Sequence, residues 1–366
     1  MPGQATQPWT PPEATSDDLA YGAPAARLLL PAGDLNDPEY RSRWEKVRRS
    51  GIGGSEVAKI LGLNKYAGPL HVFEEKHGRP VAMDAQLSEY AEVGQEIEDF
   101  IAYMFTKRTG IPAVPTPGTL ANIDRPWMRS NVDRYALDPE TGAVVAPVEL
   151  KNRSAYQLDD WQDGVPDGPA LQVHWNMAVG GWDYGWAVAL VGGNTLRYHR
   201  IERDEELIGT LIDVCGKWFQ RHVIEGYPPP ADGLEATKDL LGQLWRVKKT
   251  DVVEVSRAKA VKLRKRRAAL IAQIEELDEQ RTAVENEMRL ICGGNASVAE
   301  VEGKKAWSYV ANGTFSSKRF EEHYPVIASM CRTTKEVLDM ALIKEKYPTE
   351  YEDCCARVLR VPKKEL

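Results

Sequence analysis

Three charged residues in the middle of the sequence have the types and spacing of a metal-dependent catalytic centre. Asp133 is followed sixteen residues later by Glu149, and Lys151 comes two residues after Glu149. Alternate residues of a β-strand share a face, so Glu149 and Lys151 point to the same side, and Asp133 joins them if it lies on a neighbouring strand. The pattern predicts two carboxylates and one ammonium in a single cluster.

Such a cluster can bind a hard divalent cation. Magnesium prefers oxygen ligands and usually keeps several waters, so a few carboxylates are sufficient to hold it. A protonated lysine is not a ligand, but it can orient or help deprotonate a bound water, or offset charge that develops on a phosphate. The alternative is a solvated strand face with cross-strand ion pairs, which the spacing alone does not exclude.

The strands that must position this cluster are predicted from alternating apolar residues. Residues 128–137 and 144–152 indicate a hairpin around the turn segment DPETG, and residues 184–191 and 195–201 indicate two strands joined by GGN. Helical spacing predicts helices over 69–77, 88–109, 170–179 and 204–222. We therefore expect an α/β fold in which a central mixed sheet is flanked by helices.

Two further polar positions lie at predicted helix features. Ser55 comes directly before apolar residues at helical spacing and is predicted to cap that helix. The predicted helix 88–109 carries Glu96, Glu98 and Asp99 shortly after Gly94. One of these acids can lean over the strand cluster, or the three can form a helix edge that faces water.

Composition and proline-rich segments divide the chain into three predicted parts. Its 366 residues are 43% hydrophobic and 28% charged and include 10 Trp, which is typical of a globular protein with a sizeable core. Seven prolines and little periodicity predict a flexible tail over residues 1–38. The core is predicted over 39–232, ending at the proline-rich segment YPPPADG, and a mostly helical extension over 233–366. No segment approaches the roughly 18 apolar residues of a membrane span, so we expect a cytoplasmic protein.

The extension is predicted to contain a long helix with a coiled-coil-like face. Apolar residues recur every seven positions in a segment rich in Glu, Arg, Lys and Ala, at Leu263, Leu270, Leu277, Val284 and Ile291. This face can pack between subunits or against its own chain. Residues 297–310 alternate like a hairpin.

The net charge of −7 argues against a nucleic-acid partner, but the charge is sorted along the chain. The segment RAKAVKLRKRR, residues 257–267, carries seven basic residues and no acid. This run is either a solvated helix face or a contact to phosphates.

Five motifs in order resemble the YqaJ-like viral recombinase and lambda exonuclease family of PD-(D/E)xK nucleases. They are WEKVR at 44–48 with GIGGSEV at 51–57, the pair Gly94 and Glu98, Asp133, Glu149-Leu150-Lys151, and Leu171-Gln172-Val173. The segment FSSKRF at 315–320 resembles the C-terminal part of phage members. The resemblance, strongest over residues 40–225, implies a PD-(D/E)xK nuclease core.

The resemblance also implies roles for individual residues. Asp133 and Glu149 would ligate Mg²⁺ or Mn²⁺, with two ions expected, and Glu98 and the carbonyl of Leu150 would complete the ligands. Lys151 would position the attacking water, and Gln172 would support the site. Arg48 and Ser55 would recognise a 5′-phosphate, which a forked guanidinium and a hydroxyl at a helix start are suited to bind.

The activity that the resemblance implies is a magnesium-dependent 5′-to-3′ exonuclease that acts on double-stranded DNA ends and leaves 3′ single strands. A single-strand annealing protein would receive those strands. The subunits would form a homo-oligomer, which can close into a ring around DNA. The protein would act in the cytoplasm of the host cell. Two alternatives remain. One is a non-catalytic scaffold that binds DNA ends, and the other is an interaction protein organised by the coiled coil.

Two features depart from the family pattern. Arg134 follows Asp133 where the family usually has glycine, so a bulky cation can contact DNA or crowd the site. The cysteines, Cys215, Cys292, Cys331, Cys354 and Cys355, lack the spacing that holds an iron–sulfur cluster in some relatives, and we expect no cluster. His174 and the aromatic residues Trp175, Trp182, Tyr184 and Trp186 are interpreted as structural rather than as ligand or base-stacking groups.

Overall fold

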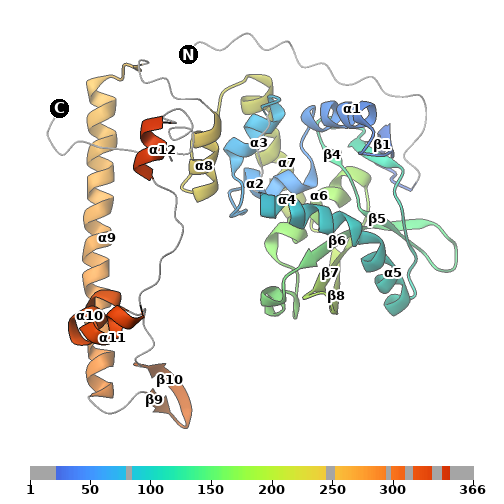
Figure 1. Cartoon of the computed structure of the whole chain (residues 1–366). Helices are drawn as coiled ribbons and strands as arrows, with labels where there is room; N and C mark the ends of the chain where they lie inside the picture. The colour runs from blue at the N-terminus through green and yellow to red at the C-terminus, as the bar shows by residue number, and fades with distance from the viewer. Residues whose placement is uncertain are drawn as a thin grey trace. The chain divides into compact units, whose positions relative to one another are not determined.

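The computed structural model describes residues 22–79, 85–244, 252–293, 298–309, 316–331 and 340–346 (Figure 1). The chain divides into two compact units, residues 1–246 and residues 247–366. The two units are described separately.

A five-stranded mixed sheet forms the centre of the first unit, in the order β2–β5–β6–β7–β8. Its strands are β2 (Ala113–Val114), β5 (Arg134–Leu137), β6 (Val144–Arg153), β7 (Tyr184–Val191) and β8 (Thr195–Glu202). Only β6 and β7 pair in parallel, because the helix α6 (Asp167–Gly180) connects them, whereas tight turns join the antiparallel pairs β5–β6 and β7–β8. Both predicted hairpins are present.

Helices cover both faces of this sheet. The side chains of β7 alternate between two clusters, with Ala187 and Ala189 packed in the cluster that contains α6, and Val188 and Leu190 in the cluster that contains α5 (Glu98–Thr109). The mixed α/β fold predicted from the sequence is therefore confirmed. Strand β6, which carries Glu149 and Lys151, therefore lies between two layers that cover the faces of the sheet.

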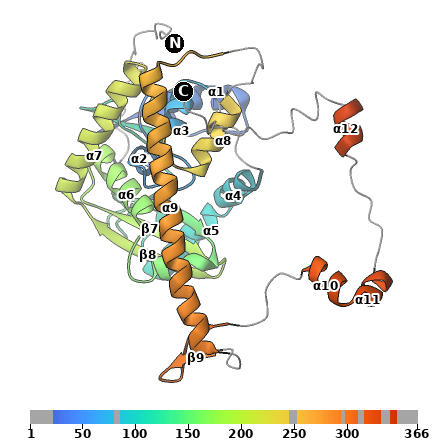
Figure 2. The same ribbon diagram turned by 90° about the vertical axis from the view of Figure 1, so that its left-hand side faces the viewer.

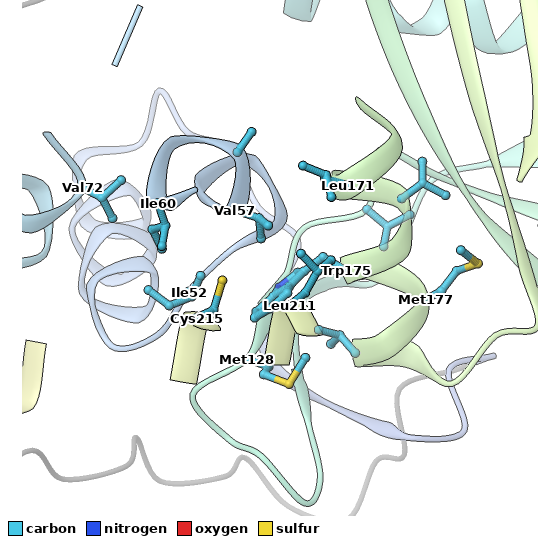
Figure 3. Close-up of a cluster of buried hydrophobic side chains, with 14 of the residues drawn as sticks. Ile52, Val57, Ile60, Val72, Met128, Leu171, Trp175, Met177, Leu211 and Cys215 are labelled. Carbon is cyan, nitrogen blue, oxygen red and sulfur yellow. The ribbon is translucent and has the colours of Figure 1, made fainter. Parts of the chain in front are cut away.

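The larger cluster joins α6 to the helices of the N-terminal part. These are α1 (Pro38–Arg49), α2 (Gly54–Ile60) and α3 (Pro69–Lys76). Figure 3 shows Val57 of α2 pointing toward Leu171 and Trp175 of α6, and all three side chains are buried. Helix α2 is thus held firmly on α6, which fixes the start of α2 near the sheet.

A second, smaller sheet has the order β1–β3–β4, with β1 at Ala26–Pro31, β3 at Gly118–Asn122 and β4 at Arg129–Ser130. Strand β1 lies in the range predicted as a tail, where Ala26, Leu29 and Leu30 are buried. The tail prediction for residues 1–21 lies outside the described residues. The seven prolines of residues 1–38 favoured the prediction of a tail, but the short strand β1 is stabilised by antiparallel pairing with β3.

The first unit closes with helices that extend past the predicted boundary. Helix α7 (Glu205–Trp218) begins after Asp204, whose carboxylate accepts from the amide of Leu207, and a π-helical turn follows at Phe219–Ile224. Helix α8 (Glu235–Leu244) contacts α3 and buries Leu240. Because α8 packs on α3, the compact unit ends after residue 246 rather than after residue 232.

Three local predictions are corrected. The predicted helix 88–109 is two helices, α4 (Ala85–Glu96) and α5, which meet at Ile97. The predicted strand 128–137 is divided, because Arg129–Ser130 joins the small sheet and only Arg134–Leu137 joins the large one. Ser55 does not cap α2, because the helix already begins at Gly54 after the cap residue Gly53.

The second unit is built around one long helix, α9 (Arg257–Cys292), drawn in orange in Figure 2. The predicted hairpin follows it as β9 (Val298–Val301) and β10 (Lys304–Ser308). The remaining described helices are α10 (Ser317–His323), α11 (Pro325–Met330) and α12 (Met340–Lys346). Among the described residues, none of the helices has the length and apolar character needed to cross a bilayer.

Candidate active site

The cluster predicted from Asp133, Glu149 and Lys151 is assembled where β5 begins. Arg134 pairs with Val148 in the antiparallel register, so Asp133, one residue earlier, lies opposite Glu149. The carboxylate of Asp133 accepts a hydrogen bond of 2.7 Å from the amide of Leu150. This bond fixes Asp133 at the edge of β6, although Asp133 itself is outside the strand.

Glu149 is a fully buried carboxyl group with three polar neighbours. One of its oxygens pairs with the ammonium of Lys151, and the other accepts a hydrogen bond of 3.3 Å from the side-chain amide of Asn176. Burial, and then the negative charge of Asp133, raise the pKa of Glu149 to about 8, although Lys151 opposes the shift. The carboxyl groups of Asp133 and Glu149 are in contact, and the charge of Lys151 is not sufficient for both to ionise easily.

Lys151 remains the cation of this cluster. Burial lowers the pKa of its ammonium, but the attraction of Glu149 and Asp133 outweighs burial, so its pKa lies above the usual value. Its side chain is 21% exposed, whereas that of Glu149 is inaccessible. Part of the Lys151 side chain is therefore accessible, while its ammonium contacts the inaccessible carboxyl group of Glu149.

Glu98, the first residue of α5, belongs to the same electrostatic group. Burial, and then the charge of Asp133, raise the pKa of Glu98 to about 7, and Arg134 opposes this shift. The sequence left open which acid of this helix approaches the strands. Of the acids near the start of α5, Glu98 is coupled to Asp133, while the side chain of Asp99 is almost fully exposed.

Arg134, the unusual residue after Asp133, turns toward α5. Its guanidinium donates 2.6 Å to the backbone carbonyl of Asp133, lies 3.7 Å from a carboxylate oxygen of Glu98 and pairs with Asp99. Asp133 presents its carboxylate to Leu150 instead. Arg134 thus holds α5 against the start of β5, and its guanidinium bonds to the backbone rather than to the side chain of Asp133.

The donor set fits a hard divalent cation. Asp133, Glu149 and Glu98 are all carboxylates, and burial together with the charge of Asp133 raises the pKa values of Glu149 and Glu98. In the part of the chain that the structure describes, no three side chains of His, Cys, Asp or Glu converge closely enough to enclose a metal ion by themselves. Magnesium uses few protein ligands and keeps waters, so an open set of this kind is suitable.

Asn176 is a functional candidate that the sequence prediction missed. It is buried on α6, its amide donates to Glu149, and its carbonyl oxygen accepts 2.7 Å from the hydroxyl of Ser130. This chain of hydrogen bonds orients the inner oxygen of Glu149 from the side of the small sheet. The available signal was a second amide in the apolar helix 170–179, one turn after Gln172.

Gln172 lies where α6 meets the start of α2. A Cβ on Gly54 would come within 3.0 Å of the Gln172 side chain and 3.1 Å of the Asn176 carbonyl oxygen. The glycine therefore lets α2 approach the same face of α6 that orients Glu149. Gln172 is half-buried, and the α6 amide that bonds to Glu149 is that of Asn176, so the expected supporting role of Gln172 is not visible as a direct contact.

Arg48 and Ser55 are brought to the same corner of the first unit. Ser55 is exposed in the first turn of α2, and the next residue, Glu56, lies 3.7 Å from the guanidinium of Arg48. Glu56 is buried and pairs with the buried ammonium of Lys76 at 2.6 Å. Lys76 also donates 2.8 Å to the carbonyl of Arg48. This network fixes the end of α1 beside the start of α2, while the Arg48 side chain stays 36% exposed.

Most of the residues interpreted as structural are indeed in the core. His174 donates at 2.9 Å to the carbonyl of Ala170, and Trp175 donates at 2.9 Å to the carbonyl of Arg129. Trp182 is buried and donates to the carbonyl of Gly22. None of these three side chains is placed to stack on a base.

The raised pKa of Glu149 predicts how stability varies with pH in the metal-free protein. The pKa is about 8 in the folded chain and about 4.3 in an unfolded chain. Between these values the folded state binds more protons, so the free energy of unfolding falls as pH rises, by up to about 1.4 kcal/mol per pH unit for each proton. We expect thermal denaturation in chelator to show a falling Tm between about pH 5 and pH 8, and added Mg²⁺ to raise Tm at the upper end.

The matched variants are Glu149→Gln and Glu140→Gln. Glu140 lies in the exposed turn between β5 and β6, so its replacement should leave the pH dependence unchanged. Glu149→Gln should flatten it. If wild type and Glu149→Gln lose stability equally over this range, the raised pKa of Glu149 is wrong.

Two carboxylates and a lysine lie at one strand edge of a mixed sheet, and a third acid lies on the covering helix, which is a nuclease-like arrangement in an α/β domain. Residues 43–183 match the family model described as the YqaJ-like viral recombinase domain. Over these residues the chain is similar to that family, in agreement with the resemblance of its motifs.

Individual proteins are also similar to this chain. The chain is 28% identical over 295 residues to the uncharacterized protein YqaJ of Bacillus subtilis, covering 79% of this chain and 90% of that protein. A crystal structure of an alkaline exonuclease from Laribacter hongkongensis aligns with 49% of this chain and 91% of its own, at 16% identity and a TM-score of 0.39. A phage-related exonuclease from Haemophilus somnus aligns with 48% and 96%, at 12% identity and a TM-score of 0.36.

Proposed function

We propose that this protein is a magnesium-dependent exonuclease that degrades one strand of double-stranded DNA from its 5′ end and leaves a 3′ single strand. The observation that carries the proposal is the buried carboxyl group of Glu149, which contacts Asp133, pairs with Lys151 and is held by Asn176. A solvated strand face would not bury a carboxylate beside another acid. Similarity to the family supports the same activity.

The site residues divide the work between binding and proton transfer. Mg²⁺ would be held by Asp133, Glu149 and Glu98, with the carbonyl of Leu150, and when bound it would polarise the phosphate and stabilise the leaving oxygen. Lys151 holds a water and donates to the charged phosphate oxygens. Asn176 keeps Glu149 in one orientation. Two such ions are proposed, because phosphodiester hydrolysis needs both the attacking and the leaving oxygen stabilised.

The polarity of digestion is proposed to come from Arg48 and Ser55. Arg48 keeps part of its guanidinium exposed although Glu56 and Glu75 lie within 3.7 Å of it. Ser55 is exposed in the first turn of α2, where backbone amides favour an anion. A 5′-phosphate bound there would lie beside α6, whose Gln172 and Asn176 connect this corner to Glu149.

The biological setting is proposed from the family. We place the enzyme in the cytoplasm of a host cell, where a single-strand annealing protein would take over the 3′ strand for phage-type recombination. A homo-oligomer that closes into a ring would keep the enzyme on its DNA. It would also reconcile the net charge of −7 with DNA binding, because basic residues can line the inner surface of a ring.

The test is digestion of a linear duplex labelled at either the 5′ or the 3′ end. We expect mononucleotides to be released from the 5′-phosphorylated strand with Mg²⁺, a 3′ single strand to accumulate, and chelator to stop the reaction. A protein that binds ends without degrading them would instead be a scaffold. A protein that does neither would favour the coiled-coil interaction protein.

A further inference from the structure

Helix α9 exposes a continuous apolar face. Its residues at seven-residue spacing, together with one at the intervening position, are between 50% and 63% exposed: Leu263, Leu270, Ile274, Leu277 and Val284. The helix has 36 residues, about 54 Å at 1.5 Å per residue. Long exposed helices gain most of their stability from packing of such a face, and a patch of this size marks an interaction surface.

We propose that α9 pairs with α9 of a second copy of this chain as an antiparallel two-stranded coiled coil. This inference does not rest on the proposed exonuclease activity. In heptad notation, the leucines that repeat every seven residues occupy position d. Position a then holds Ala260, Arg267, Ile274, Arg281 and Met288.

The charges that flank the face select the antiparallel direction. In the N-terminal half, the flanking e and g positions carry Arg264 and Arg266, and in the C-terminal half they carry Glu285 and Glu287. Antiparallel pairing matches e with e and g with g from opposite ends. When Ile274 lies opposite Leu277 of the second copy, this register places Arg264 opposite Glu285 and Arg266 opposite Glu287.

The arginines at position a oppose the parallel alternative. In a parallel pair, each a residue meets the same residue of the other helix, so Arg267 would face Arg267 and Arg281 would face Arg281. Like charges in one layer are destabilising. In the antiparallel register, Arg267 lies opposite Val284 and Arg281 lies opposite Leu270. Each arginine can then extend its stem along an apolar neighbour and keep its charge in water.

The hairpin that follows α9 leaves this face available. Trp307 of β10 donates 3.2 Å to the backbone carbonyl of Met288, and Cys292 at the end of α9 is buried. Val284 and Ile291 nevertheless remain 56% and 67% exposed. The hairpin therefore lies beside the C-terminal turns of α9 without covering position d.

The experiment measures the mass of the full-length protein by light scattering at about 50 mM salt, where the Debye length is longer than at physiological salt. The double variant Arg264→Glu/Arg266→Glu should have half the mass of wild type, because both ends of α9 become acidic. Adding Glu285→Arg/Glu287→Arg to this variant should restore the wild-type mass. A parallel pair would not be weakened by the first change, since basic residues there face basic or apolar ones.

The matched control is Lys262→Glu/Lys265→Glu, which makes the same change of charge in the same turns of α9 but at positions c and f, outside the pair. It should keep the wild-type mass, as should Asp133→Asn, so loss of catalysis and loss of pairing are distinguishable. An unchanged mass in Arg264→Glu/Arg266→Glu, or failure of the charge swap to restore a reduced mass, would overturn the antiparallel pairing.

Discussion

Asp133→Asn should reduce the rate of nucleotide release from linear duplex DNA by more than about 100-fold. Stabilisation of phosphate charge by a bound cation is worth several kcal/mol, and each 1.4 kcal/mol changes a rate about tenfold. Asparagine has nearly the same shape as aspartate and can still accept the bond that Leu150 donates. The substitution therefore removes the charge that would hold Mg²⁺ while it leaves the start of β5 in place.

The matched control for this prediction is Asp138→Asn. Asp138 lies just past the other end of β5, is half-buried and accepts hydrogen bonds from the amides of Glu140 and Thr141, which asparagine can also accept. Its variant should digest DNA at the wild-type rate. Initial rates on end-labelled duplex, with Tm values to check folding, decide the matter. Full activity in Asp133→Asn would remove Asp133 from the proposed site.

Lys151→Met tests the second half of the same site. We expect a loss of about 100-fold or more, because a positioned proton-transfer group typically contributes that much. Binding of the duplex end should persist, since the substitution leaves Arg48 and Ser55 unchanged. Lys151 also compensates the charge of Glu149, so the substitution raises the pKa of Glu149 further. Full activity in Lys151→Met would remove Lys151 from the proposed site.

The second large effect concerns the 5′ end of the substrate. Wild type should digest a 5′-phosphorylated end about 10- to 100-fold faster than a 5′-hydroxyl end, since a charge-assisted hydrogen bond is worth about 1.5–3 kcal/mol. Arg48→Ala should lose most of this difference, chiefly through slower digestion of the phosphorylated end. The ratio of the two rates is the measured quantity, so a general loss of activity does not imitate the effect.

Arg41→Ala is the control on the same helix. Arg41 is mostly exposed and lies 4.0 Å from Glu45 on the surface of α1. Its variant should keep the wild-type ratio of rates. Equal rates on phosphorylated and hydroxyl ends in wild type would contradict the phosphate pocket. They would not affect the metal site, because the ratio of the two rates tests Arg48, whereas the rate of digestion itself tests Asp133.

Predictions from the sequence succeeded where the residues that determine an element lie close together in the chain. The strand 184–191 was predicted correctly, and 195–201 within one residue, because apolar alternation and the GGN turn lie within a few residues of each other. Helix α3 was predicted with its proline start and an end within one residue, since Gly78 at φ 70° stops the chain locally. That Glu149 and Lys151 share one face of β6 likewise follows from strand geometry alone.

Predictions failed where a partner distant in sequence decides the structure. The strand 128–137 is divided because its first part pairs with β3 and its second with β6, two partners that no local pattern identifies. Strand β1 exists because β3 pairs with it. The prolines around β1 carried the stronger local signal.

The sequence by itself determined which residue types are available for chemistry and which strand faces they share. Only the tertiary structure decided that Glu149 is buried against Asp133, that Asn176 reaches it from α6, and that Arg134 turns away toward α5. Burial and hydrogen bonding depend on elements brought together by packing. The charge state of a side chain is set by those neighbours rather than by its position along the chain.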